Sequence, residues 1–382
     1  MKSLRLPFYA IGLWGAGAAG RWFGVSIFSP YAIWFFGAGL ILLLYAALKT
    51  TYYRSGRLWP ADSDRPRPLR LAWLDYVKAG VCWFDAFKRT YVVEPGLYYT
   101  GTHYDREAPL LVTSNYLLTV FLVVRRIRAF NARLLVVDTG GINVWCAAGK
   151  GRFSNAEILK QLDRYDRERL TDGKWLTLVL PKVGLAGIDL RALRKAGIRP
   201  VIGPLYARDL PAYLSKPPFK DRDEDRILFG LQSRVFTWLP GLVQFLGYSF
   251  ALVAVLLVVE YVWGMPAPLG LLGITGFLAT AYPVLFPWIP GVRFAVKGLW
   301  LAAFTSLGIG ALTLVEILTS VDLIMAVFFT FATSIFIGLS YTGNSAVSNY
   351  SRVRKEIARF LPPDVLLYIG SLAAFVVKGV LR

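Results

Sequence analysis

Two patterns of hydrophobic residues occur along the chain: long apolar runs near both ends and short apolar runs in the middle. About 20 apolar residues are needed to cross the hydrocarbon core of a bilayer. Residues 31–48 meet this requirement, and residues 7–28 approach it although Arg21 interrupts them. Further runs of this kind lie near 241–263, 267–286, 298–318, 321–341 and 363–380. The pattern predicts one or two N-terminal spans and about five C-terminal ones, with seven as the preferred total.

The charges between these runs predict how the spans are oriented. The connections 264–266 and 320–322 contain no lysine or arginine, whereas the loops 287–297 and 342–362 contain both. Basic loops stay on the cytoplasmic side of a membrane. We therefore expect these two loops, together with the central region of the chain, in the cytoplasm, and the protein itself in the inner membrane.

The central region has the pattern of a soluble α/β domain. Apolar runs of strand length occupy 110–113, 133–138, 175–180 and 199–202, and helical stretches lie near 116–129, 155–169, 187–196 and 206–214. Ser154 and Glu157 form a capping-box pattern at the start of one predicted helix. Strands that alternate with helices form βαβ units and a mostly parallel sheet. The sequence therefore predicts a Rossmann-like domain beside a polytopic α-helical membrane domain.

These patterns divide the chain into four predicted parts. They are an N-terminal membrane segment at 1–50, a linker at 51–84, a cytoplasmic α/β domain at 85–235 and a C-terminal membrane domain at 236–382.

Composition agrees with a membrane protein and argues against several other classes. Hydrophobic residues make up 55% of the chain, yet its formal net charge is +19. Attraction to anionic membrane lipid explains this charge, and no nucleic-acid-binding module is recognisable. Two cysteines and one histidine are too few for a multi-cysteine zinc or iron–sulfur site. We therefore expect membrane lipid as a partner and no nucleic acid.

Candidate chemistry is concentrated just after the predicted strand 133–138. The strand leads into Asp138, Thr139, Gly140 and Gly141, and the run Asn143, Val144, Trp145, Cys146, Ala147, Ala148, Gly149 and Lys150 follows. Ligands bind beyond the carboxyl ends of strands in open α/β sheets, and glycines let backbone approach a planar ligand. A helix N-terminus would stabilise a thiolate. Cys146 is thus either a soft metal ligand or a small buried residue, and Asp138 and Thr139 either bind the ligand or form a turn.

The run from Asn143 to Lys150 resembles the cap-helix signature of the membrane corrinoid protein of the bacterial and archaeal mercury-methylation pair. The similarity also includes the segments 93–98, 112–116, 138–142, 151–153, 180–184, 203–204 and 209–211, and it covers roughly residues 85–215. The central domain of that family is in turn similar to the corrinoid domain of the carbonyl-branch corrinoid iron–sulfur protein.

This resemblance implies a corrinoid-dependent methyltransferase with a cobalt-containing, cobalamin-type cofactor. It gives Cys146 the role of cobalt ligand, with the other residues of the 143–150 run forming a cap around it. The methyl group would pass from cobalt to Hg(II), giving methylmercury. The resemblance also implies a small two-cluster [4Fe-4S] ferredoxin that restores Co(I), a folate-linked methyltransferase that supplies the methyl group, and anaerobic one-carbon metabolism.

Two other hypotheses remain open. The family commonly has a lysine and an aspartate where this chain has Leu117 and Phe121, so the methyl acceptor could be a metalloid or a one-carbon-pathway protein. Alternatively, the protein is a non-enzymatic membrane transporter or scaffold whose central domain binds a regulatory ligand. Elsewhere, we expect Cys82 to be a buried or interfacial thiol and His103 to be a solvated loop residue.

Overall fold

The computed structural model of the chain divides into two compact units, 1–225 and 226–382. It describes residues 43, 47, 65–85, 90–165, 170–171, 175–217, 227–238, 240–241, 270–315, 317–345, 348 and 350–381. The predicted spans at 7–28, 31–48 and 241–263 fall almost wholly outside these residues.

The first unit is built on a six-stranded, mostly parallel sheet. Its strands are β1 (Arg67–Pro68), β2 (Gly96–Tyr99), β3 (Leu110–Ser114), β4 (Arg133–Val137), β5 (Leu176–Leu180) and β6 (Ile198–Ile202). They lie in the order β1-β2-β4-β3-β5-β6. The pairs β1–β2, β4–β3, β3–β5 and β5–β6 are parallel, and the β2–β4 pair is antiparallel. The predicted fold class is confirmed.

The apolar runs of the sequence correspond to the inner strands of this sheet. The four predicted strands match β3 to β6 to within one residue at each end. All residues of β3 and β4 are buried, as expected of parallel strands that are covered on both faces. Strand β6 lies at one edge of the sheet and contains Pro200, a residue that is tolerated at an edge because it lacks an N–H group.

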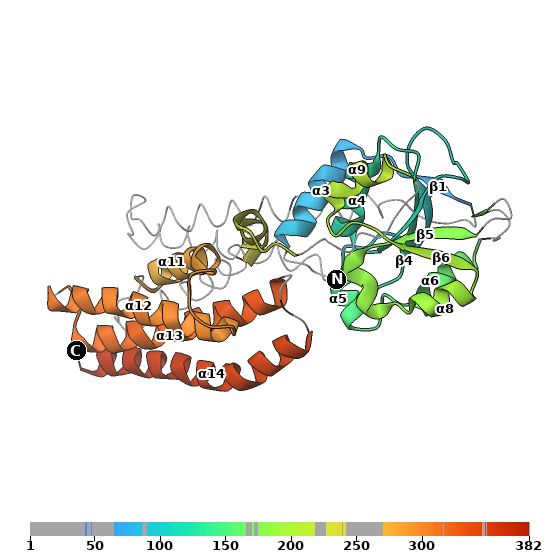
Figure 1. Ribbon diagram of the computed structural model, residues 1–382. Coiled ribbons are helices and arrows are strands. Elements are labelled where there is room, and N and C mark those ends of the chain that lie inside the picture. Colours follow the sequence, from blue (N-terminus) through green and yellow to red (C-terminus); the bar gives the residue numbers. More distant parts are fainter. Residues whose placement is uncertain are drawn as a thin grey trace. The chain divides into compact units, whose positions relative to one another are not determined.

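Helices cover both faces of the sheet and enclose two separate cores (Figure 1). On one face lie α3 (Trp73–Phe84), α4 (Leu117–Ile127) and α9 (Leu210–Leu214), and on the other lie α5 (Val144–Gly149), α6 (Asn155–Leu162) and α8 (Leu190–Lys195). The 3₁₀ helices η2 (Lys182–Gly187) and η3 (Ala207–Asp209) follow β5 and β6. Ser154 caps α6, as predicted, because its hydroxyl accepts a hydrogen bond from the amide of Glu157.

Part of the segment that we predicted as a linker belongs to the folded unit. Residues within 51–84 form β1 and α3, and α3 packs Val81 and Cys82 into the core that it shares with α4. Asp75 and Lys78 are also buried in this helix. These charged residues interrupt the apolar pattern, which is why the helix is difficult to recognise in the sequence.

The second unit contains helices that are long and apolar enough to cross a membrane. Its helices are α11 (Gly270–Leu285), α12 (Phe294–Leu314), α13 (Ser320–Asn344) and α14 (Tyr350–Val380), besides a short helical stretch at 231–238. Among the described residues, three segments satisfy the length and composition of a span: Phe294–Leu314, Ser320–Thr342 and Ser351–Val380. Helix α11 is apolar but shorter. These helices correspond to the last four predicted spans.

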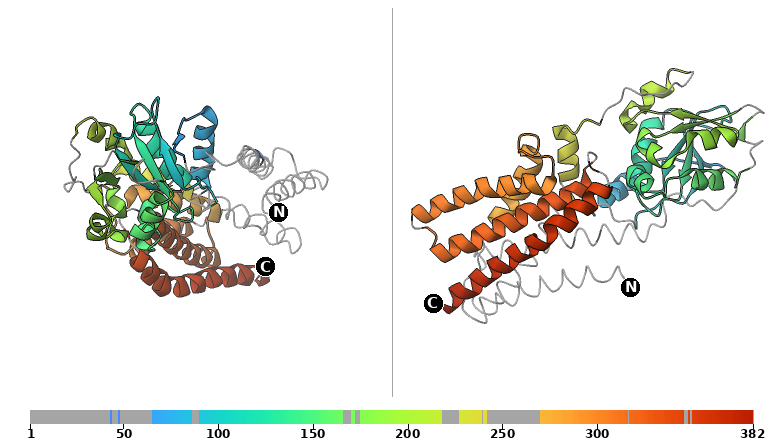
Figure 2. Two further views of the ribbon diagram at one scale, coloured as in Figure 1. Left: turned by 90° about the vertical axis from the view of Figure 1, so that its right-hand side faces the viewer. Right: turned by 60° about the horizontal axis from the view of Figure 1, so that its bottom comes forward.

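Two glycines allow α12 and α13 to approach each other closely. A Cβ atom on Gly298 would lie 2.5 Å from the carbonyl oxygen of Ser334, and one on Gly338 would lie 2.7 Å from that of Phe294. The Ser334 hydroxyl donates a hydrogen bond to the Gly298 carbonyl over 2.8 Å. Small residues and hydroxyl groups are typical of contacts between membrane helices. The long helices α12, α13 and α14 run side by side in Figures 1 and 2.

Candidate functional site

The strand order creates a crevice at the carboxyl ends of β3 and β5. From β3 the chain passes through α4 to β4 on one side, whereas from β5 it passes through α8 to β6 on the other. Connections that leave neighbouring parallel strands in opposite directions form a switch point, where open α/β sheets bind their ligands. A cleft of about 270 Å³ lies at this edge. The fold therefore marks this edge as the candidate site.

Most of the cleft is lined by apolar side chains. They come from β3, α4, β5 and η2, and include Leu111, Val112, Leu122, Val179, Leu180 and Val183. Polar groups in the lining come from Thr113, Thr119 and Asn143. Binding sites for organic ligands commonly combine apolar walls with a few polar groups that fix orientation. This lining suits a mainly apolar surface of a ligand that carries some polar substituents.

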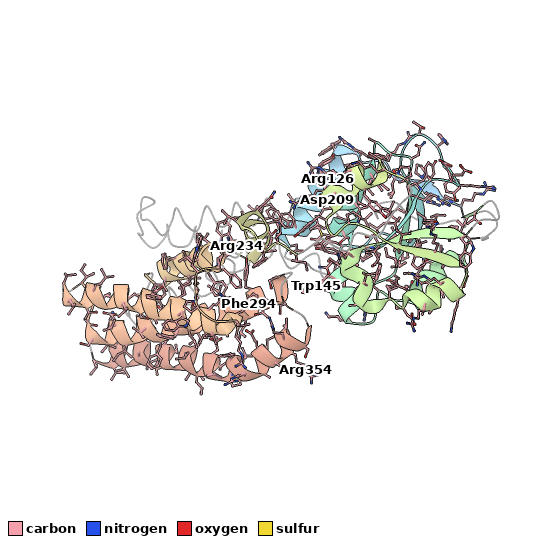
Figure 3. The ribbon with its side chains drawn as sticks, viewed as in Figure 1. Arg126, Trp145, Asp209, Arg234, Phe294 and Arg354 are labelled. Atoms are coloured by element: carbon pink, nitrogen blue, oxygen red, sulfur yellow. The ribbon has the colours of Figure 1, made fainter. Side chains whose placement is uncertain are left out.

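The start of α5 brings the candidate cysteine next to the cleft. Asn143, Val144 and Trp145 line the cleft, and Cys146 follows them in the first turn of the helix. The side-chain oxygen of Asn143 accepts a hydrogen bond from the Cys146 amide over 2.8 Å, which caps the helix. Cys146 is half-buried and packs against the second core. Trp145 is also half-buried, and Figure 3 marks it on α5.

The same hydrogen bond limits how far α5 can stabilise a thiolate at Cys146. A helix N-terminus stabilises a thiolate through its dipole and its free N–H groups. Helix α5 has only six residues, and the Cys146 amide already donates to Asn143. The helix therefore supplies a fixed position for the sulfur, and its dipole is a minor contribution.

Asn115, at the end of β3, organises the loop that precedes α5. Its side-chain oxygen accepts hydrogen bonds from the Thr139 amide, the Thr139 hydroxyl and the Gly141 amide at 3.1, 2.8 and 3.1 Å. Its amide nitrogen donates to the carboxylate of Asp138 over 3.0 Å. Gly140 and Gly141 have φ angles of 67° and 69°, which favour glycine. Asn115 thus ties the end of β3 to the loop that follows the neighbouring strand β4.

The loop residues differ in how accessible they are to a ligand. Thr139 is fully buried, and its hydroxyl also lies within hydrogen-bond distance, 2.7 Å, of the Ile142 carbonyl. The structure therefore uses Thr139 to form the turn, one of the two roles considered for it. Asp138 accepts a hydrogen bond from the Gly140 amide over 2.9 Å but remains exposed. Asp138 is the polar group of this loop that a ligand can reach.

Ala147 and Ala148 are buried between α5 and η2. Ala147 is fully buried and Ala148 is 5% exposed. A Cβ atom on Gly187 would lie 2.1 Å from the Phe153 carbonyl oxygen and 3.2 Å from the Cα of Ala148. Small residues are therefore required here for packing, whatever the ligand. In contrast, Gly149 and Lys150 are exposed at the end of α5.

Cys82, in contrast, is inaccessible to solvent, as expected for a buried thiol. It is fully buried on α3, and its sulfur donates a hydrogen bond to the Tyr116 hydroxyl over 3.3 Å. Burial raises the pKa of the Cys82 thiol to about 12. The sulfur therefore remains protonated at neutral pH. His103 is exposed beside the Thr102 hydroxyl, as predicted for a loop residue.

Leu117 and Phe121, which stand where the resembled family commonly has a lysine and an aspartate, do not line the cleft. In the structure both are buried in the core beneath α3, and the Phe121 ring lies 5.1 Å from that of Tyr76. The α4 residues that line the cleft are Thr119, Leu122 and Val123.

The cleft also lacks the ligands of an ordinary protein metal site. Among the residues that the structure describes, no group of three or more histidine, cysteine, aspartate or glutamate side chains could hold a metal ion.

Comparison with known proteins gives two partial matches. No family model matches the chain. The chain is 30% identical over 132 residues to acetyl-CoA decarbonylase/synthase complex subunit gamma 1 of Methanosarcina thermophila, covering 33% of this chain and 27% of the relative. It is 31% identical over 126 residues to the subunit gamma of that complex from Methanopyrus kandleri, covering 32% and 26%.

These matches have a limited extent. The chain spans about a quarter of the length of the curated relatives it matches. Neither relative is named for mercury methylation. Similarity to these gamma subunits is therefore established over about a third of the chain, and the methyl acceptor is a separate question.

Proposed function

We propose that the first unit binds a corrinoid at the carboxyl edge of its sheet and serves as a methyl carrier, with Cys146 as the cobalt ligand. The position of Cys146 carries this proposal: its half-buried sulfur follows directly on residues that line the cleft at the switch point. Similarity to gamma subunits of the acetyl-CoA decarbonylase/synthase complex and the motif resemblance of the 143–150 run support it. A bound corrinoid would supply a cobalt centre that can accept and donate a methyl group.

The residues at the site fit such a cofactor. Cysteine sulfur is a soft ligand suited to a transition metal, and the apolar lining of the cleft suits the face of a macrocycle. Asn143 caps the first turn of α5, in which Cys146 lies. Trp145, the residue before Cys146, lines the cleft. Asp138 and Lys150, both exposed, would face the polar substituents at the edge of the ring.

We further propose Hg(II) as the methyl acceptor, with methylmercury as the product. The motif similarity of the 143–150 run supports this choice. Regeneration of the carrier needs a reductant of low potential, for which we propose a small two-cluster [4Fe-4S] ferredoxin. A folate-linked methyltransferase would supply the methyl group. The proposed location is the cytoplasmic face of the inner membrane, with the second unit as anchor.

Anaerobic reconstitution tests the ligand role of Cys146. The full-length protein is loaded with hydroxocobalamin under reducing conditions, and its absorption spectrum and its transfer of methyl groups to Hg(II) are measured. We expect Cys146→Ala to lose the spectral signature of sulfur ligation and to lower transfer at least about 100-fold, more than an outer-shell change typically does. Cys82→Ala is the matched control and keeps both. Identical spectra for Cys146→Ala and the unchanged protein would rule out the ligand role.

A corrinoid methyl carrier with another acceptor is the second candidate. The names of the two relatives refer to acetyl-CoA chemistry, which favours a one-carbon-pathway protein as acceptor. Methyl-transfer assays of the corrinoid-loaded protein distinguish the two candidates. Methyl transfer to a protein or metalloid acceptor, with none to Hg(II), would favour the second candidate and leave the role of Cys146 intact. A protein that retains no corrinoid would favour the transporter or scaffold hypothesis.

A further inference from the structure

The second unit contains a cavity whose walls carry an excess of positive charge. The cavity measures about 600 Å³ and lies between the segment that enters α12 and the first turns of α14. Its basic lining residues are Arg293, Arg352, Lys355 and Arg359, and all four are exposed to solvent. One carboxylate, that of Glu356, also lines it. We call it the α12–α14 cavity.

The spacing along α14 explains why these cations gather at one place. Arg352, Lys355 and Arg359 are separated by three and four residues, so they share one face of the helix. Arg293 immediately precedes α12 and faces them across the cavity. Two helices that are far apart in the sequence therefore contribute to one basic site.

Glu356 is the single carboxylate among the four basic residues of the lining, and it also joins α14 to α12. It is 3% exposed, and its two carboxylate oxygens accept hydrogen bonds from the amides of Phe294 and Ala295 at 3.3 and 3.2 Å. Both amides belong to the first turn of α12, which carries partial positive charge. The four basic residues outnumber this single carboxylate, so the cavity retains a net attraction for an anion.

The cavity also lies at the end of two candidate spans. Phe294–Leu314 begins directly after Arg293, and the basic residues of α14 precede its mainly apolar portion. Basic residues at such a position lie at the depth of lipid headgroups. Val292 and Phe360 add apolar surface to the lining. The site therefore combines cations for a phosphate with apolar contacts for the adjoining part of an amphiphile.

We propose that the α12–α14 cavity binds the phosphate group of an anionic phospholipid. Arginine side chains bind phosphate through paired N–H groups, and basic pockets between membrane helices bind acidic headgroups. The proposal does not depend on the corrinoid site, because every residue that forms it belongs to the second unit. Bound lipid would brace the start of α14 against α12.

The test compares lining residues with a neighbour on the same helix. Arg354 lies in the same turn of α14 but does not line the cavity, and Figure 3 marks it near the start of that helix. Full-length protein in detergent is titrated with phosphatidylglycerol, and bound lipid is counted by native mass spectrometry. Removing one interfacial positive charge weakens lipid binding about fivefold. We expect this loss for Arg359→Gln, and a loss of less than about twofold for Arg354→Gln.

A triple variant and a second ligand make the outcomes decisive. Replacing Arg352, Lys355 and Arg359 together by glutamine should weaken binding on the order of 100-fold, with unchanged helix content by circular dichroism. Equal losses for Arg359→Gln and Arg354→Gln would overturn the proposal, because they would indicate general attraction to the membrane. Titration with inorganic phosphate in phosphatidylcholine nanodiscs identifies the source. Tight phosphate binding that is lost in the triple variant would overturn lipid as the ligand.

Discussion

The helices on the two faces of the sheet in the first unit each carry a cysteine, and the two cysteines differ in burial. On the α3 face, Cys82 is fully buried and hydrogen-bonded to Tyr116. On the α5 face, Cys146 is half-buried beside an apolar cleft. Helix α3 has twelve residues and packs its cysteine in the core, whereas α5 has six and begins beyond the carboxyl edge of the sheet. The two cysteines thus differ in burial according to where their helices lie relative to the sheet edge.

The largest expected difference between the two faces is in chemical reactivity. Under anaerobic conditions without cofactor, we expect iodoacetamide to modify Cys146 on the order of 10³ times faster than Cys82, because modification of Cys82 requires local unfolding of the core. Between pH 7 and 9 the Cys82 thiol also stays protonated, because its pKa is raised to about 12. Mass spectrometry of proteolytic peptides measures both rates.

A denatured sample is the control for this experiment. In strong denaturant both thiols have ordinary pKa values of about 8.5, so their rates should become similar. Comparable rates in the folded protein would contradict the distinction between a buried and an accessible sulfur.

The next largest effect concerns the glycines on the α5 face. Gly187→Ala should destabilise the protein by about 3 kcal/mol, since its new Cβ would lie 2.1 Å from a carbonyl oxygen. Gly149→Ala should instead leave stability unchanged or raise it by about 0.5 kcal/mol, because no atom lies within 4 Å of its added Cβ. Denaturant unfolding followed by tryptophan fluorescence measures both.

The Gly149→Ala variant also distinguishes an effect on packing from an effect on ligand binding. If Gly149 forms part of the cap around a corrinoid, Gly149→Ala should weaken binding about tenfold, as overpacking of a contact by about 1.4 kcal/mol would do. Stability without the cofactor should not fall. Unchanged cofactor affinity would exclude Gly149 from the contact surface.

Loss of Asn115 should loosen the loop before α5, because the Asn115 side chain holds this loop at the end of β3. Asn115→Ala removes four hydrogen bonds and leaves the buried amides of Thr139 and Gly141 without an acceptor. We expect a loss of about 2–3 kcal/mol and faster hydrogen exchange in 138–141. A stability loss with unchanged exchange in this loop would show that Asn115 acts elsewhere.

The smallest predicted effect is confined to the α5 face. Asn143→Ala removes the cap of α5 and should cost about 1 kcal/mol. Fraying of the first turn should increase alkylation of Cys146 a few-fold and leave that of Cys82 unchanged. Asn155→Ala, which removes hydrogen bonds to the Asp189 backbone outside the cleft, is a suitable control. An equal change at both cysteines would mean that the α5 cap is not a local feature.

The clarity of the hydrophobic pattern explains which parts of the fold the sequence predicts. Strands β3 to β6 and the apolar helices of the second unit are continuous apolar runs, so their pattern is sufficient. Strands β1 and β2 have only two and four residues, and α3 buries Asp75 and Lys78. Neither short strands nor buried charges produce a clear hydrophobic period.

The sequence predicts the position of the candidate site better than the contacts that form it. Residues that follow a strand are expected at the carboxyl edge of the sheet, which locates Cys146. The role of Asn115 depends on hydrogen bonds to residues 23 to 26 positions later, and no local pattern signals them. The contribution of Gly187 and the gathering of Arg293 with Arg359 likewise depend on contacts between distant segments.

The outer strands of the sheet affect how neighbouring copies of this protein behave. Strand β1 has two residues, and β6 contains Pro200, which lacks an N–H group, next to the exposed Arg199. Both are poor templates for pairing with a strand from another molecule. Copies of the first unit can meet repeatedly at high local concentration. Because the edge strands are short or interrupted, these copies can be crowded together without pairing into aggregated fibres.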